Sequence, residues 1–166
     1  MEAIWKMIWK LNCPKKIKHF MWRACKNILP TKNCLKVRGM GLEDCCAVCG
    51  LSETSRHTLR GCEFANTVWS ATKIKLSWLP DPLRDFIDLV WVVMESHSNI
   101  DWVKFAVIAW SLCNNRNTIV NGGQGRGQEA LTRFVTEFID EFKQDHHTPI
   151  RVVPVALQLW TPPQQG

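Results

Sequence analysis

The stretch from Cys46 to Cys62 reads CAVCGLSETSRHTLRGC, and its four potential metal ligands decide the fold. Two residues separate Cys46 from Cys49, seven separate Cys49 from His57, and four separate His57 from Cys62. Three thiolates and one imidazole at such spacing can complete a tetrahedral zinc site, with no coordination position left open for water. The sequence therefore predicts one structural Zn²⁺ held by Cys46, Cys49, His57 and Cys62.

Two alternatives remain within this stretch. Cys45 directly precedes Cys46, so either thiol could be the first ligand, although the two-residue gap of a Cys-x-x-Cys knuckle favours Cys46. The four residues could also be buried thiols and a surface imidazole. Two spaced pairs in so short a stretch favour the metal site. Gly50 fits a tight turn after Cys49, because glycine adopts positive φ freely.

Basic residues are concentrated in the N-terminal part of the chain. Residues 1–62 contain 12 Lys and Arg against 4 Asp and Glu, whereas residues 63–166 contain 9 against 11. No acidic residue occurs from Ala3 to Leu42. Beside a zinc knuckle, this asymmetry favours contact with RNA or DNA over a merely solvated face. The candidate phosphate-binding residues are Lys15, Lys16, Lys18, Arg23, Lys26, Lys32, Lys36 and Arg38.

Composition argues against secretion and membrane insertion. The N-terminal lysines are interleaved with Trp and Ile, unlike a signal peptide, and no apolar run is long enough to span a bilayer. The eight cysteines, with no secretory context, indicate reduced thiols. We therefore expect an intracellular protein, in the nucleus or the cytoplasm, with no membrane partner.

Helical periodicity dominates residues 1–76. Apolar residues recur at spacings of three and four in segments at about 2–11, 15–27, 32–38 and 63–73. Thr31 and Gly39 are typical of the N-cap and the end of the third segment. Trp22 lies beside the apolar stripe of the second segment, where we expect it to pack in the core rather than stack on a base. That stripe consists of Ile17, Phe20, Met21, Ala24 and Ile28.

Three further helices are predicted at about residues 83–94, 100–116 and 128–143. The middle one is apolar almost all round, so it should be a central buried helix. The last could pack on the preceding two or on another chain. His146 and His147 have no paired ligand and are interpreted as polar loop residues. The predicted fold class is mainly α: a zinc-stapled helical domain (1–76), a helical linker region (77–147) and a disordered proline-rich tail (148–166).

Several of these segments together resemble a known family. They are PKKIKHFMW at 14–22, NILPT at 27–31, CAVCG at 46–50, and Glu53-Thr54 with His57, Cys62, Ala65 and Val68-Trp69. This order is similar to the reverse-transcriptase zinc-binding domain of plant LINE-type (non-LTR) retrotransposon polyproteins, over about Trp5 to Trp69. The resemblance places the family's ligands on the same three cysteines and histidine. Thr58-Leu59 departs from the Leu-Phe that often follows the histidine in the family.

The resemblance implies a module that lies between a reverse transcriptase and a ribonuclease H domain. The segment LWTPP at 159–163 resembles the lead-in to that nuclease, whose own metal-binding acids are missing here. We therefore expect a fragment or decayed copy of a polyprotein that is not an enzyme. It would bind nucleic acid non-specifically and could contact the reverse transcriptase or ribonuclease H parts. The alternative is a zinc-stapled scaffold whose later helices dock a polymerase or partner subunit.

Overall fold

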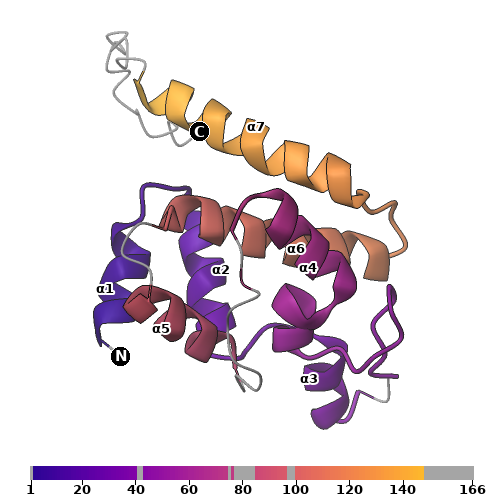
Figure 1. The fold of residues 1–166 in the computed structure, drawn as a ribbon. Helices are drawn as coiled ribbons and strands as arrows, with labels where there is room; N and C mark the ends of the chain where they lie inside the picture. The colour runs from indigo at the N-terminus through magenta and orange to yellow at the C-terminus, as the bar shows by residue number, and fades with distance from the viewer. Residues whose placement is uncertain (1, 41–42, 75, 77–84, 97–99, 148–166) are drawn as a thin grey trace, which may run out of the picture.

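The computed structural model describes residues 2–40, 43–74, 76, 85–96 and 100–147. Within these ranges the chain is helical and contains no β-strand, which confirms the predicted mainly α class. The predicted tail, 148–166, and residues 83–84 of a predicted helix lie outside the described residues. The elements (Figure 1) are α1 (Glu2–Lys10), α2 (Lys15–Cys25), α3 (Lys32–Val37), η1 (His57–Gly61), α4 (Glu63–Ala71), α5 (Phe86–Ser96), α6 (Trp102–Val120) and α7 (Gln128–His147).

Local sequence signals set the limits of α3. The Thr31 hydroxyl accepts a hydrogen bond from the Cys34 amide at 3.3 Å, so Thr31 is the predicted N-cap. Gly39 follows the helix with φ of +79°, a conformation that glycine adopts without steric cost. Both predictions made from the sequence are confirmed.

Helix α2 ends earlier than its apolar periodicity suggested. The helix stops at Cys25, and Asn27 takes a φ of +53°, so the chain turns before Ile28. Ile28 is consequently 38% exposed, and its assignment to the buried stripe is wrong. Leu29 is buried in its place, at 2% exposed. Trp22 is 36% exposed on the outer side of α2, so its interpretation as a core residue is also wrong.

Helix α6 is the central helix, as its all-round apolarity predicted. It packs against α2, α4, α7 and η1. The five consecutive side chains from Phe105 to Ala109 are all inaccessible to solvent, so the helix is buried on every side at this point. Helices from both halves of the sequence thereby share one hydrophobic core.

Aromatic rings fill the middle of this core. Phe105 of α6 lies 5.0 Å from Trp69 of α4 and 5.3 Å from Trp102, measured between ring centroids. Phe86 of α5 stacks on the same ring at 6.1 Å. Phe105 therefore joins α4, α5 and α6, and it is fully buried.

Helix α7 runs along the molecule beside α6 and α4 (Figure 1). Its apolar residues Leu131, Val135 and Ile139 are buried against this chain.

At one end of the molecule lie α1, α2 and α5, and at the other lie α3 and the hairpin that carries the candidate metal ligands (Figure 1). The boundary between the zinc-stapled domain and the helical linker region, placed between residues 76 and 77 from the sequence, stays a prediction. None of the described helices is both long and apolar enough to cross a membrane.

Candidate metal centre and nucleic-acid interface

A tight hairpin positions the first two cysteines. Its arms are joined by bonds from the Cys46 amide to the Leu51 carbonyl at 2.7 Å and from the Glu53 amide to the Asp44 carbonyl at 2.6 Å. The Gly50 amide donates to the Cys46 carbonyl at 2.9 Å, and Gly50 has φ of +77° as expected for this turn. The Val48 amide points at the Cys46 sulfur, 3.4 Å away. The backbone therefore folds around the sulfur in the manner of a zinc knuckle.

A single π-helical turn, η1, presents the other two residues. The Cys62 amide donates to the His57 carbonyl at 2.8 Å, a bond that spans five residues. This i to i+5 bond explains the four-residue gap between His57 and Cys62, because it brings the two ends of the turn together. The turn is anchored by Thr54, whose hydroxyl accepts from the His57 amide at 3.0 Å, and by Trp69, whose indole donates to the Leu59 carbonyl at 2.7 Å.

The four predicted ligands converge on one point. One potential ligand atom from each of Cys46, Cys49, His57 and Cys62 lies within 4.8 Å of the others. The Cys49 sulfur is 3.2 Å from His57 Nε2. In a tetrahedral zinc site, bond lengths of about 2.3 Å to sulfur and 2.0 Å to nitrogen place neighbouring ligand atoms about 3.5–3.8 Å apart. The observed cluster is consistent with a zinc site of that size. Cys45 is exposed and is paired with Ser52 in an isolated β-bridge instead.

Two of the four residues have pKa shifts that favour their metal-binding forms. Burial lowers the pKa of His57, which favours the neutral imidazole that binds metal. The pKa of Cys49 is lowered chiefly by the Leu51 backbone amide. Burial raises the pKa of Cys62 to about 11, and the neighbouring Cys46 and Cys49 thiols add to this shift. Three converging thiolates repel one another, and a divalent cation would offset that repulsion.

A buried ion pair ties the hairpin to the rest of the fold. Glu53 is 1% exposed, and its Oε1 accepts hydrogen bonds from the Lys32 amide at 2.8 Å and from Arg116 of α6. Arg116 also donates to the Pro30 carbonyl at 3.2 Å. One carboxylate therefore joins the ligand hairpin, the start of α3 and the C-terminal part of α6. Sequence reasoning missed this pair because the partners lie 63 residues apart.

Comparison with known families agrees with this geometry. Residues 1–69 match the family model described as zinc-binding in reverse transcriptase. The chain thus contains a reverse-transcriptase-associated zinc-binding domain with a cluster of three cysteines and one histidine. No curated protein and no solved structure matches the chain.

The eight candidate phosphate-binding residues do not lie on one face. The Lys16 ammonium lies over the rings of Trp110 and Phe138, 4.6 and 5.2 Å from their centroids, and so faces α6 and α7. Lys32 donates to the Cys45 carbonyl at 2.8 Å, beside the metal ligands. These two side chains support the fold, and their role in nucleic-acid binding stays a prediction.

Lys36 also has a protein partner. Its ammonium is 2.9 Å from an Asp44 carboxylate oxygen, and this bond, with one from Ser52, lowers the pKa of Asp44 to about 2. Arg23 is exposed. Lys15, Lys18 and Lys26 lie on the outer side of α2 and are described below.

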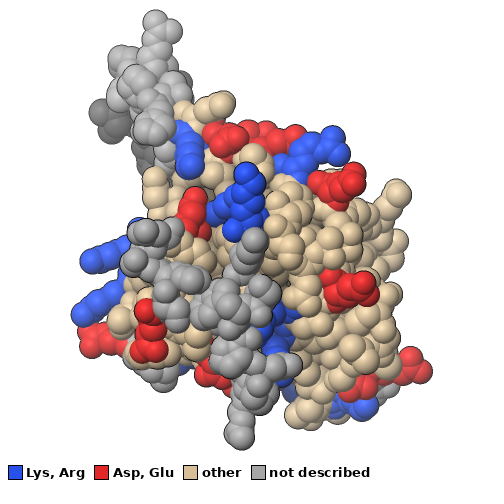
Figure 2. Space-filling view, in the orientation of Figure 1, with Lys and Arg blue, Asp and Glu red and all other residues tan. Residues whose placement is uncertain are grey.

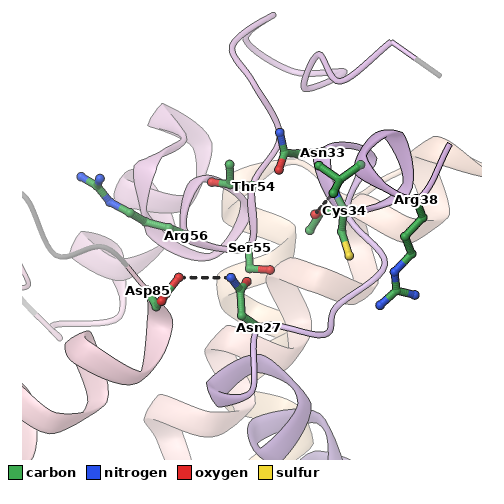
Figure 3. A pocket seen from close by; sticks show the side chains of 10 residues that line it. Asn27, Asn33, Cys34, Arg38, Thr54, Ser55, Arg56 and Asp85 are labelled. Carbon is green, nitrogen blue, oxygen red and sulfur yellow. Dashed lines mark hydrogen bonds between the residues drawn. The ribbon is translucent and has the colours of Figure 1, made fainter. Parts of the chain in front are cut away.

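Arg38 lines an open polar pocket of about 400 Å³ between α3 and the segment before η1 (Figure 3). Arg56 is on the opposite side of the pocket, and Ser55 lies between the two arginines (Figure 3). Asp85 borders it and accepts a hydrogen bond from the Asn27 amide group at 3.1 Å. The two guanidinium groups point in different directions, with that of Arg56 directed away from Ser55 (Figure 3), and Asp85 gives one edge an opposing charge, so these side chains do not converge on one anion. The sequence reasoning did not select Arg56.

Charge is mixed on the face shown in Figure 2. Lys and Arg side chains alternate with Asp and Glu over this face, and uncharged surface separates them (Figure 2). A broad, purely basic surface is not seen in this view. A nucleic-acid contact is therefore expected to be local, on a few elements, rather than spread over this side of the molecule.

Proposed function

We propose that this chain is a non-catalytic zinc-binding module, derived from a plant LINE-type retroelement polyprotein, that binds nucleic acid without sequence specificity. One Zn²⁺, held by Cys46, Cys49, His57 and Cys62, would fix the hairpin to η1 and so serve a structural role. Lys and Arg side chains of the N-terminal part would contact phosphates. In this proposal the module acts beside the reverse transcriptase or ribonuclease H parts of such a polyprotein.

The observation that carries the proposal is the convergence of all four ligands inside a segment that matches a reverse-transcriptase zinc-binding family. The concentration of basic residues in the same segment supports nucleic acid as the partner. Four protein ligands would fill a tetrahedral zinc, which supports a structural rather than a hydrolytic site.

The scaffold alternative has less support. It requires apolar helix faces that are open to a partner; Val90 of α5 and Val135 of α7 are fully buried within this chain, although Trp91 of α5 is 36% exposed. A stable dimer that is indifferent to nucleic acid would nevertheless favour the scaffold.

The first experiment measures zinc content and nucleic-acid affinity in the same preparations. The wild-type chain should contain one zinc per molecule, and a Cys46→Ala/Cys49→Ala variant should lose both the metal and cooperative unfolding. Binding to labelled RNA and DNA of unrelated sequences should be similar. It should also weaken steeply with salt, because each phosphate contact releases condensed counterions.

Different failures have different meanings. A well-folded wild type without zinc would refute the structural-metal part of the proposal. Zinc binding with no salt-dependent affinity for RNA or DNA would refute the nucleic-acid part and leave the metal site intact.

A further inference from the structure

The exposed side of α2 carries one continuous row of basic and aromatic side chains. Lys15, Lys18, His19, Trp22 and Lys26, which we call the α2 ridge, share one side of the helix, because each lies three or four residues from another member and only Lys18 and His19 are adjacent. Lys18 is half-buried and the other four are exposed. The buried stripe of α2 lies on the opposite side of the helix. The ridge is therefore a surface feature that the core does not require.

Helix α1 adds two tryptophans along this ridge. Trp9 is 46% exposed, and its ring meets that of His19 edge to face, with centroids 5.4 Å apart. The Lys18 ammonium donates to the Trp9 carbonyl at 3.0 Å. At the other end, the Lys26 ammonium lies over the Trp5 ring, 5.0 Å from its centroid. Aromatic rings and cations thus lie side by side along the ridge.

The charge around the ridge favours an anionic partner. Neither α2 nor the turn that precedes it contains an acidic residue. On the neighbouring elements, Glu2 of α1 is paired with Lys6 at 2.7 Å, and Asp85 before α5 accepts the hydrogen bond from Asn27 at the Lys26 end of α2. Helix α5, which also packs on α2, carries Asp88 and Glu95. The ridge thus combines exposed aromatic rings with lysines that have no carboxylate partner on α2. This combination matches a nucleic-acid strand, which offers phosphates and base faces together.

We propose that the α2 ridge, with Trp9, binds single-stranded nucleic acid by stacking bases on Trp9 and Trp22 while the lysines contact phosphates. The proposal rests on the nucleic-acid function proposed above and assigns it a location and a strand type. In a duplex the base faces are stacked within the helix, so exposed indoles gain little from it; unpaired bases can stack on aromatic side chains. From Lys15 to Lys26 the ridge is about 17 Å long, at about 1.5 Å per residue. At about 3.4 Å per nucleotide, the rise of a fully stacked strand, that length spans at most about five nucleotides, and an extended strand would place fewer along it.

The test compares the affinity of the whole zinc-loaded chain for single-stranded and for double-stranded probes. The probes are a fluorescein-labelled single-stranded 12-mer of mixed sequence, as RNA and as DNA, and the blunt DNA duplex of the same sequence, followed by fluorescence anisotropy. The wild type should bind the single strands more tightly. Trp22→Ala and Trp9→Ala should each weaken single-strand binding by about five-fold or more, and duplex binding much less.

Trp91→Ala is the matched control. Trp91 on α5 is 36% exposed, the same fraction as Trp22, but it is not part of the ridge. Its removal should leave single-strand affinity unchanged. Trp22→Phe keeps an aromatic face and should retain most of the affinity, whereas Trp22→Leu should not. Zinc content and melting temperature verify folding for each variant, and the Phe and Leu pair decides the question if an alanine variant is unstable.

Each other result has a definite meaning. Salt-dependent binding that Trp9 and Trp22 substitutions leave intact, or that Trp91→Ala weakens equally, would overturn the ridge and leave the proposed function standing. Equal or tighter binding of the duplex would also overturn it. Absence of binding to every probe would refute the ridge together with the nucleic-acid part of the proposed function.

Discussion

Replacing Arg116 by methionine tests whether α6 holds the metal-ligand hairpin in place. The substitution removes the guanidinium that bonds Glu53 and the Pro30 carbonyl, but keeps much of the apolar length of the side chain. Glu53 would remain as a buried carboxylate, 1% exposed, with the Lys32 amide as its remaining charge-stabilising partner.

The expected cost follows from this burial. Removing one partner of a buried ion pair leaves an uncompensated charge, at a cost of about 3–5 kcal/mol in the free energy of unfolding. For a chain of this length, each kcal/mol corresponds to a shift of roughly 2–4 °C in melting temperature, so Arg116→Met should melt roughly 6–20 °C below the wild type. Adding Glu53→Gln removes the second charge while its amide oxygen can still accept from Lys32. The double variant should therefore recover more than half of the loss.

The assay is thermal and urea unfolding of the zinc-loaded protein, followed by circular dichroism, with all four members of the double-mutant cycle. Lys36→Ala is the control, because it breaks an ion pair with Asp44 that is exposed to solvent. Exposed pairs contribute little to stability, so this variant should be indistinguishable from the wild type. An Arg116→Met variant as stable as the wild type, or a double variant no better than Arg116→Met, would refute the reasoning.

Three further predictions concern the hairpin, η1 and the cysteines. Trp69→Phe removes the indole donor from the buried Leu59 carbonyl and should cost about 1–3 kcal/mol in urea denaturation; an unchanged midpoint would contradict this role. Gly50→Ala should destabilise the hairpin by about 1–2 kcal/mol because φ there is +77°. Gly127→Ala, also with open space at its Cβ position, changes the N-cap of α7 without a positive φ and should cost less; equal effects would exclude backbone strain as the cause. In the zinc-loaded protein iodoacetamide should modify Cys45 rapidly and Cys46, Cys49 and Cys62 slowly, as mass spectrometry can show; a slowly modified Cys45 would instead support Cys45 as a ligand.

The ligand set could be predicted from the sequence because its geometry is local. The Cys-x-x-Cys hairpin and the His-x4-Cys turn are each closed by backbone hydrogen bonds within a few residues, so spacing alone indicates where the sulfurs and the imidazole point. The π-helical form of the second turn was not anticipated. The signal for it was the four-residue gap itself, which an i to i+5 bond spans.

Periodicity located the helices but not their ends. In α2 the apolar spacing continued through Ile28, yet the helix stops at Cys25 and Asn27 turns the chain. Similarly, Trp22 was assigned to the core because large aromatic residues are usually buried. Its exposure depends on which neighbours cover that side of α2, which one-dimensional spacing does not reveal.

The sequence by itself determined the helical class, the four-ligand cluster and the basic character of the N-terminal part. Each of these depends on residue types and short-range spacing, which act before the chain is folded. Only the tertiary structure decided that Arg116 meets Glu53, that Lys16 faces Trp110 and Phe138, and that Trp9 joins the exposed row on α2. These contacts join different elements, and most of them are distant in sequence. Their formation therefore depends on how the helices pack around α6 and not on any local pattern.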